Sequence, residues 1–273
     1  MIRLDGPLVL AGAGNMGGAM LAGWLQRGLA PAHIIVQDPG PPPATAELLA
    51  KHGIRSVQSI DDLPRPPSVL LMAVKPQVMD QVFAPLAKLA GPSTVVLSIA
   101  AGRTIASFEK FLRDGAAVVR SIPNTPAAVG RGITVAAANA HVTEQHKQTV
   151  SELLSAIGEV AWVDNEALID PVTAVSGSGP AYVFHMVEAL AAAGVAVGLK
   201  PELAMQLARA TVTGSGELLH QSPLDAATLR QNVTSPNGTT HAALQVLMAK
   251  DGLTPLMTAA VTAATKRSRE LAQ

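Results

Sequence analysis

A glycine-rich segment near the N-terminus has the residue types and the spacing of a phosphate-binding turn. The run Gly12-Ala13-Gly14-Asn15-Met16-Gly17 follows the apolar segment Leu8–Ala11 and opens a segment with helical periodicity. Glycines permit a tight turn and close approach of the backbone, and the free N–H groups of a helix N-terminus bind a pyrophosphate. Because strand, turn and helix agree, the pattern predicts a dinucleotide site rather than a glycine-rich turn that binds nothing.

Asp38 has the position of a residue that selects the cofactor. It lies 21 residues after Gly17, at the end of the apolar run Ile34–Gln37. An acidic side chain at this place accepts a hydrogen bond from the 2′-hydroxyl of the adenosine ribose, and no arginine follows it to hold a 2′-phosphate. Asp38 therefore favours NADH, although NADPH stays open and a solvated turn aspartate has the same pattern.

Two further segments end apolar runs and are expected at the nicotinamide end of the cofactor. The first is Ala73-Val74-Lys75-Pro76, and the second is Ala100-Ala101-Gly102. The carboxyl ends of parallel strands face the ligand in an open sheet, so Lys75 would neighbour the nicotinamide and the small residues would lie against it. An ordinary surface lysine explains Lys75 equally well.

A turn of small polar residues near the C-terminus predicts an anion site without arginine. The run Ser235-Pro236-Asn237-Gly238-Thr239-Thr240 leads into an expected helix over Thr240–Ala249. Free N–H groups and the dipole at the N-terminus of this helix would bind a carboxylate, and the Ser and Thr hydroxyls would add donors. An ordinary helix start with a capping threonine is the alternative.

The elements that must position these residues fall into two halves. Up to about residue 165, short apolar runs alternate with amphipathic segments, which is typical of βαβ units and a doubly wound parallel sheet. The expected strands are Leu8–Ala11, Ile34–Gln37, Val69–Val74, Thr94–Ile99, Ala117–Ile122, Ile133–Ala137 and Val160–Val163. The expected helices between them are Met16–Arg27, Ala44–His52, Val78–Ala90 and Thr143–Ile157.

From Glu166 onward no strand is expected, because Ala, Leu, Met and Val recur at helical spacing. The expected helices are Ala181–Val197, Pro201–His220, Ala226–Gln231, Thr240–Ala249 and Leu253–Leu271. The predicted fold class is therefore α/β, with a Rossmann NAD(P)-binding domain over residues 1–165 and an all-helical domain over residues 166–273.

The composition argues against several classes of protein. The 273 residues contain no cysteine and balance 20 basic against 20 acidic side chains, which argues against thiolate chemistry and nucleic-acid binding. The longest apolar run, Ala189–Leu199, is about half of what a membrane span requires. The seven histidines lack the spacing of a metal motif. We expect a soluble cytoplasmic protein without a metal site.

Three further strings carry information, over Arg120–Pro126, Thr173–Tyr182 and Val233–Thr240. Together with the glycine-rich turn and Ala73–Gln77, they resemble the pyrroline-5-carboxylate reductases, and the resemblance runs from the first expected strand to the last helix. It implies hydride transfer from NADPH or NADH to the C=N carbon of Δ1-pyrroline-5-carboxylate, giving L-proline in the last step of proline biosynthesis. It also implies a helical dimerisation domain and a homodimer, which in this family often assembles further into a decamer.

The resemblance also assigns site residues. Ala11, Gly12, Ala13, Gly14, Asn15 and Met16 would hold the pyrophosphate, Val74–Pro76 and Ala100–Gly102 would line the nicotinamide ribose, and Asn232 would touch the cofactor. Glu166, Thr173, Ser235, Thr239 and Thr240 would lie on the substrate side. Asn237-Gly238 replaces the usual Gly-Gly pair, which is acceptable because asparagine tolerates left-handed geometry. An asparagine often found near the adenosine ribose is matched at best by Ser59, which weakens an NADPH assignment.

Thr173 is the catalytic candidate. An imine accepts hydride far better once it is protonated, so its nitrogen needs a hydrogen-bond partner, and the resemblance offers Thr173. Threonine is too weak an acid to donate a proton, so we expect the substrate to arrive protonated or to take a proton through water. Glu166 would favour the cation electrostatically, or would merely cap a helix. Catalysis would rest mainly on placing the two reacting carbons in contact.

Two other functions remain to be separated from this one. A β-hydroxyacid dehydrogenase also joins a Rossmann domain to a helical one, but it needs a catalytic lysine, and Lys200, Lys250 and Lys266 do not follow the glycine-rich string in the required way. A redox sensor would bind NAD(P)H without turnover, yet it would have no need of the anion turn. Turnover of the imine distinguishes all three.

Overall fold

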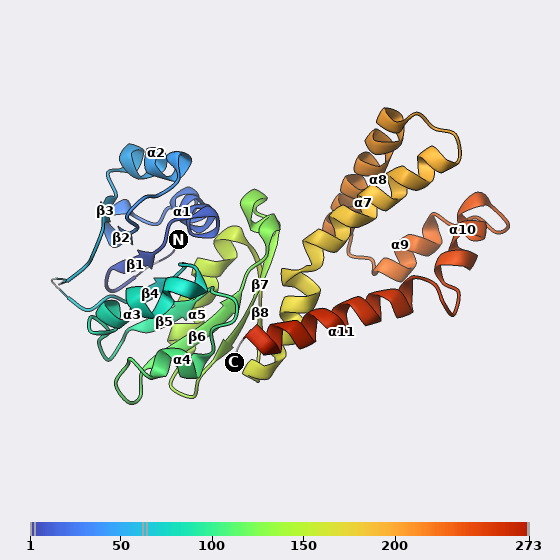
Figure 1. Ribbon diagram of the computed structural model, residues 1–273. Helices are drawn as coiled ribbons and strands as arrows, with labels where there is room; N and C mark the ends of the chain where they lie inside the picture. Colours follow the sequence, from blue (N-terminus) through green and yellow to red (C-terminus); the bar gives the residue numbers. More distant parts are fainter. Residues whose placement is uncertain (1, 3, 62, 64, 272–273) are drawn as a thin grey trace. The chain divides into compact units, whose positions relative to one another are not determined.

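The computed structural model describes residues 2, 4–61, 63 and 65–271, which form two compact units (Figure 1). The first unit contains the chain up to Gly177 and again from Ala264, and the second contains Ser178–Ala263. The chain therefore passes from the first unit to the second once and returns within its last helix. Among the described residues, no helix is both long and apolar enough to cross a membrane.

The first unit is built on one mixed sheet. Its strands are β1 (Leu8–Ala11), β2 (Ile34–Gln37), β3 (Arg55–Val57), β4 (Val69–Met72), β5 (Val95–Ser98), β6 (Ala117–Ile122), β7 (Gly132–Ala138) and β8 (Gly158–Val163). Their order is β3-β2-β1-β4-β5-β6-β7-β8, and only the β6–β7 pairing is antiparallel. The order reverses between β1 and β4, which is where open α/β sheets bind their ligands.

Helices cover both faces of the sheet (Figure 1). They are α1 (Asn15–Gln26), α2 (Pro43–His52), α3 (Met79–Ala87), α4 (Ile105–Glu109), α5 (Glu144–Leu154) and α6 (Ile169–Val172). Leu8 and Leu10 of β1 belong to a core that includes Trp24 of α1, whereas Val9 belongs to a second core that includes Phe83 of α3. Alternate side chains of a strand point to opposite faces, so a strand covered on both sides must be apolar throughout.

The second unit is helical. It contains α7 (Gly179–Ala196), α8 (Pro201–Gln221), α9 (Ala226–Asn232), α10 (Thr239–Leu247) and most of α11 (Leu253–Leu271). Helices α7 and α8 approach closely because small residues meet, and a Cβ added to Gly194 would lie 3.2 Å from the Cβ of Ala204. Large apolar side chains nevertheless stay exposed in this unit, such as Phe184 at 64% and Leu256 at 66%.

The predicted α/β fold class is confirmed, and most expected elements are present within a few residues of their predicted ends. Strand β4 ends at Met72, two residues before the expected end at Val74. Strand β3 and helix α4 were not expected, because one is a three-residue strand with Arg55 and Ser56 exposed and the other is a single helical turn. Neither is long enough for its periodicity to be recognised.

The compact units divide the chain after Gly177, whereas the sequence suggests a boundary at residue 165. The twelve intervening residues stay with the sheet for a physical reason. Ile169 is fully buried against Ile122, Val135 and Ala137 of strands β6 and β7. Asn124, which follows β6, donates from Nδ2 to the carbonyl oxygen of Ser176 at 3.1 Å. The segment is thus fixed to the sheet by apolar burial and by a polar contact.

Candidate active site

The three glycines of the turn after β1 have three different surroundings. Gly12 has a φ of +91°, and a Cβ there would lie 2.8 Å from the carbonyl carbon and oxygen of Ala73. A Cβ on Gly17 would overlap the carbonyl oxygen of Gly12. A Cβ on Gly14 would meet no atom within 4 Å. Gly12 and Gly17 therefore allow close packing of the turn. Gly14 faces open space, as a pyrophosphate-binding turn requires.

Helix α1 begins in a way that leaves its first N–H groups available. Its N-cap is Gly14, no side chain caps it, and its first turn contains no acidic residue. Ala11 and Ala13 are buried on the sheet side, while Asn15 is exposed and Met16 is half-buried. Uncapped N–H groups at the positive end of a helix dipole form an anion site, so the geometry supports the predicted role of this turn.

Asp38 is fixed against the glycine-rich turn. Its Oδ2 accepts a hydrogen bond from the N–H of Ala13 at 2.7 Å, and its Oδ1 accepts one from the N–H of Gly40 at 2.9 Å. The side chain is therefore not a freely solvated turn aspartate. The Asp38 carboxylate therefore lies at the carboxyl end of β2, beside the turn that would carry the pyrophosphate.

The two segments expected at the nicotinamide end follow neighbouring strands. Ala73 and Val74 follow β4, and Lys75 and Pro76 are exposed after them. After β5, Ala100 is buried and donates its N–H to Ser98 Oγ at 3.2 Å. Ala101 is exposed, and Gly102 has a φ of +72°. Since β4 and β5 are paired and parallel, their carboxyl ends bring both segments to one edge of the sheet.

Gly102 also marks a close approach to the last turn of α11. A Cβ on Gly102 would lie 3.1 Å from the carbonyl oxygen of Leu271, the last residue of α11. The final turn of α11 therefore lies against the segment Ala100–Gly102. This contact is within the first unit.

Thr173 opens a π-helical turn over Thr173–Gly177. Such turns are rare in proteins, and those that occur are often located at functional sites. The Thr173 hydroxyl donates to the carbonyl oxygen of Ile169 at 2.7 Å, and the side chain is half-buried. Because its proton is engaged in this bond, the hydroxyl offers lone pairs, and it suits a ligand that donates a hydrogen bond.

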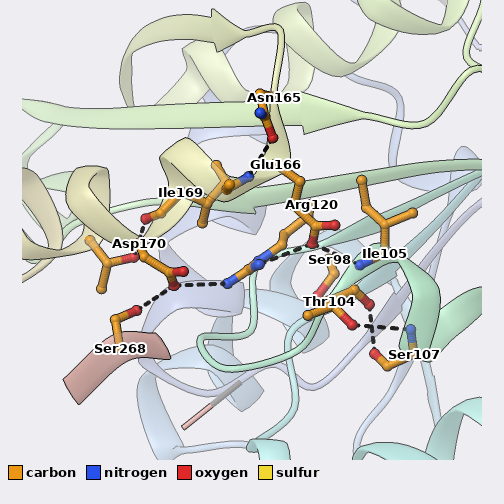
Figure 2. A network of polar contacts seen from close by, with 12 residues as sticks. Ser98, Thr104, Ile105, Ser107, Arg120, Asn165, Glu166, Ile169, Asp170 and Ser268 are labelled. Atoms are coloured by element: carbon orange, nitrogen blue, oxygen red, sulfur yellow. Dashed lines mark hydrogen bonds and ion pairs between the residues drawn. The ribbon is translucent and has the colours of Figure 1, made fainter. Parts of the chain in front are cut away.

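Glu166 belongs to a polar network with Arg120, as Figure 2 shows. Its Oε1 accepts from Arg120 Nη1 at 2.9 Å and from the N–H of Ile105 at 2.9 Å. The carboxylate thus holds the start of α4 and neutralises a buried arginine, and its predicted place beside the substrate stays a prediction. Sequence reasoning missed Arg120 as a site residue, although a single charge within the buried strand Ala117–Ile122 was a signal.

The predicted anion turn lies in the second unit. Asn237 has a φ of 58°, and it is the sole non-glycine residue with positive φ in the part of the chain that the structure describes. The N-cap of α10 is Gly238, which has no side-chain cap, and the first turn contains no acidic residue. Thr239 and Thr240 therefore do not cap the helix, contrary to the ordinary-cap alternative. Their hydroxyls and that of exposed Ser235 are available to a ligand.

Asn232 is the last residue of α9 and is exposed. Asp225 caps the other end of this helix, accepting from the backbone N–H and the side-chain hydroxyl of Thr228 at 2.9 Å each. These two bonds, the backbone one first, hold the pKa of the Asp225 carboxyl below its ordinary value. The first unit contains the glycine-rich turn, Asp38, Lys75, Ala100–Gly102, Glu166 and Thr173, whereas Asn232 and the anion turn belong to the second unit.

Among the described residues, no group of three or more His, Cys, Asp or Glu side chains is placed to hold a metal ion.

Comparison with known proteins gives consistent results along the whole chain. Residues 166–271 match the profile of a family described as pyrroline-5-carboxylate reductase dimerisation, and residues 8–102 match a family described as NADP oxidoreductase, coenzyme F420-dependent. The chain is 40% identical to the pyrroline-5-carboxylate reductase of Pseudomonas aeruginosa and 42% identical to that of Synechocystis, over 97% of each chain.

Solved structures give the same result. The pyrroline-5-carboxylate reductase of Coxiella burnetii matches with a TM-score of 0.90 and 33% identity, over 98% of this chain and 99% of that one. The Plasmodium falciparum enzyme, solved with NADP bound, matches with a TM-score of 0.79 and 28% identity over the same shares. A 3-hydroxyisobutyrate dehydrogenase at 16% identity shares only the fold.

Proposed function

The chain belongs to the pyrroline-5-carboxylate reductase family, and on this basis we propose that it transfers hydride from NAD(P)H to the C=N carbon of Δ1-pyrroline-5-carboxylate, giving L-proline. This is the last step of proline biosynthesis. The observation that carries the proposal is 40% identity to a pyrroline-5-carboxylate reductase over 97% of both chains. The bound cofactor would supply the hydride, and the protein would place it.

The test is oxidation of NADPH and of NADH by the purified protein in the presence of Δ1-pyrroline-5-carboxylate, with L-proline measured as the product. Loss of NAD(P)H absorbance with stoichiometric proline supports the proposal. Cofactor binding without turnover would instead favour the sensor function.

The protein residues would divide the work between cofactor and substrate. The uncapped start of α1 would hold the pyrophosphate, and the segments after β4 and β5 would line the nicotinamide ribose. Thr173 would accept the N–H of the protonated ring nitrogen, because its own proton is donated to Ile169. Asn232 would touch the cofactor from the second unit. No acidic group is required to deliver a proton if the substrate binds as the iminium ion.

Asp38 makes NADH an accepted cofactor. A 2′-phosphate next to this carboxylate would be repelled, whereas a 2′-hydroxyl would donate to it. In Asp38→Asn, the amide oxygen still accepts from Ala13, but the negative charge is gone. We expect the ratio of kcat/KM for NADPH to that for NADH to rise at least about 10-fold, because like charges about 4 Å apart near a protein surface repel by several kcal/mol. An unchanged ratio in steady-state kinetics would remove Asp38 from cofactor selection.

The anion turn would bind the substrate carboxylate. The uncapped N-terminus of α10 supplies N–H donors, and Thr240 supplies a half-buried hydroxyl. Replacing Thr240 by valine removes this donor with little change in volume, and we expect kcat/KM for the substrate to fall about 10-fold, the effect of losing one hydrogen bond to a charged group. Cofactor KM should not change. Thr149→Val, on α5 of the first unit, is the matched control.

The second unit would form the subunit interface. The match to a dimerisation domain over residues 166–271 supports a homo-oligomer. Large apolar side chains such as Phe184, Leu218 and Leu256 are exposed in the same unit, and exposed apolar surface is typical of protein interfaces. We propose a homodimer that assembles further into a decamer, in the cytoplasm.

A further inference from the structure

Arg120 is a charged side chain in the middle of a buried strand. It lies on β6, where its backbone pairs with Ser98 and Ala137, and its side chain is 3% exposed. Burial of an arginine costs several kcal/mol unless the charge is paired and hydrogen-bonded. The function proposed above leaves Arg120 without a role, so its partners deserve a separate explanation.

Two carboxylates neutralise Arg120. Nη1 donates to Glu166 Oε1 at 2.9 Å, and Nη2 lies 3.9 Å from Asp170 Oδ1. Both acids come from the segment that joins the two units, and Figure 2 shows them on either side of the guanidinium. Arg120 therefore holds the joining segment against the sheet at two points that are one helical turn apart.

Each carboxylate has a second partner. Glu166 Oε1 also accepts from the N–H of Ile105, the first residue of α4, which follows the segment Ala100–Gly102. Asp170 Oδ1 also accepts from the hydroxyl of Ser268 on α11 at 2.8 Å. One buried charge is thus linked to the joining segment, to the start of α4, which follows Ala100–Gly102, and to the helix on which the chain returns from the second unit.

Two further contacts link the same elements. The carbonyl oxygen of Leu271 lies close to Gly102, three residues after Ser268 on the same helix. Asn124, four residues after Arg120, donates a hydrogen bond to the carbonyl oxygen of Ser176. The segment that carries Thr173 is therefore held near both ends, by Arg120 through Glu166 and Asp170 and by Asn124 through Ser176. Arg120 and Asn124 thus contact, directly or through a carboxylate, the segment that carries Thr173 and the start of α4, which follows Ala100–Gly102.

We propose that Arg120 is a positioning residue for hydride transfer, acting through Glu166 and Asp170 to fix Ala100–Gly102, the Thr173 turn and the end of α11. The proposal rests on the proposed function. Stability is a weaker explanation, because a buried ion pair is on average no better for stability than apolar residues of the same volume. The network around Arg120 instead selects one arrangement of the three segments that it links.

The test measures single-turnover hydride transfer by stopped flow, with saturating cofactor and substrate, in wild type and in four variants. Ser268→Ala removes only the link to α11. Arg120→Lys keeps the positive charge but loses the planar guanidinium that reaches two carboxylates at once. Arg120→Met removes both the charge and the guanidinium. Arg267→Ala breaks an exposed pair with Glu270 on the same helix and is the matched control.

We expect the rate constant to fall about 3- to 10-fold in Ser268→Ala and about 100-fold in Arg120→Met, with Arg120→Lys between them, because a misplacement of about 1 Å costs a reaction about that much. Cofactor Kd should stay within about twofold of wild type, since a positioning defect spares ground-state binding. Arg267→Ala should behave as wild type.

A purely structural role gives a different result, because partial unfolding lowers the amplitude of the transient and leaves its rate constant unchanged. That result in Ser268→Ala and Arg120→Lys, or wild-type transients in both, would overturn the proposal. If Arg120→Met does not fold, these two variants still decide the outcome. Wild-type protein that does not turn over the imine would refute the proposed function itself, which is a separate result.

Discussion

The Gly14→Val variant should lose at least about 100-fold in affinity for NAD(P)H, which is the cost of losing two hydrogen bonds to a charged group at about 1.5 kcal/mol each. Its midpoint of thermal unfolding without cofactor should equal that of wild type. Gly14 has an ordinary φ of −66°, and a Cβ there meets no atom within 4 Å, so the free protein has room for the side chain. The same space is where the pyrophosphate must approach the backbone.

Gly12→Ala provides the contrast for this experiment. Its φ of +91° and the contact of an added Cβ with the backbone of Ala73 predict a loss of stability in the absence of any ligand. Cofactor titration by fluorescence and thermal unfolding of both variants would test the pair. A Gly14→Val protein that binds cofactor normally, or one that is itself destabilised, would contradict the assignment of this turn to the pyrophosphate.

The Thr173→Val variant should lose about 10- to 100-fold in kcat/KM for Δ1-pyrroline-5-carboxylate, because an acceptor for a charged N–H contributes about 1.5–3 kcal/mol. Thr173→Ser should retain most of the activity, since it keeps the hydroxyl. In both variants the affinity for cofactor should be unchanged. The measurement is steady-state kinetics with each substrate varied in turn.

The pH dependence separates an acceptor from an acid. With its proton donated to Ile169, Thr173 would stabilise an iminium that is already protonated. The rate should then rise as the pH falls through the pKa of the substrate nitrogen, and the profile of Thr173→Val should have the same shape at a lower level. A profile that changes shape in the variant would mean that Thr173 takes part in delivering the proton.

The sheet and its helices were largely predictable because burial on both faces imposes long apolar runs. Leu8–Ala11 and Ala117–Ile122 are fully buried over their whole lengths, and both were predicted with the correct ends. Strand β3 was missed because Arg55 and Ser56 are exposed at the edge of the sheet, where no apolar pattern is required. The one-turn helix α4 is too short to have a periodicity of its own.

The backbone geometry of the two turns was predictable where conformation or space dictates the residue type. Gly12 and Asn237 have positive φ, and Gly17 leaves no room for a Cβ, as tight turns at these places require. The contacts among side chains that are distant in sequence were not predictable. Nothing in the order of residues indicates that Arg120 pairs with Glu166, 46 positions later, or that Asp38 accepts from Ala13. Both contacts depend on how the chain packs.

The start of helix α10 differs from the start expected from the sequence. The sequence predicts a helix from Thr240 with an anion site at its start, and the alternative was an ordinary start capped by threonine, because Ser and Thr are preferred at that position. The helix instead begins at Thr239 after an uncapped glycine. The hydroxyls that capping would have used are available, which is what the binding of a carboxylate requires.

Turnover of Δ1-pyrroline-5-carboxylate by the purified protein, with NADPH and NADH compared side by side and L-proline quantified, tests the central claim most directly. We expect one proline to form for each cofactor oxidised, with measurable turnover by NADH because of Asp38. Tight cofactor binding without any proline from either cofactor would contradict the assignment, and it would indicate that the glycine-rich turn serves a different reaction or none.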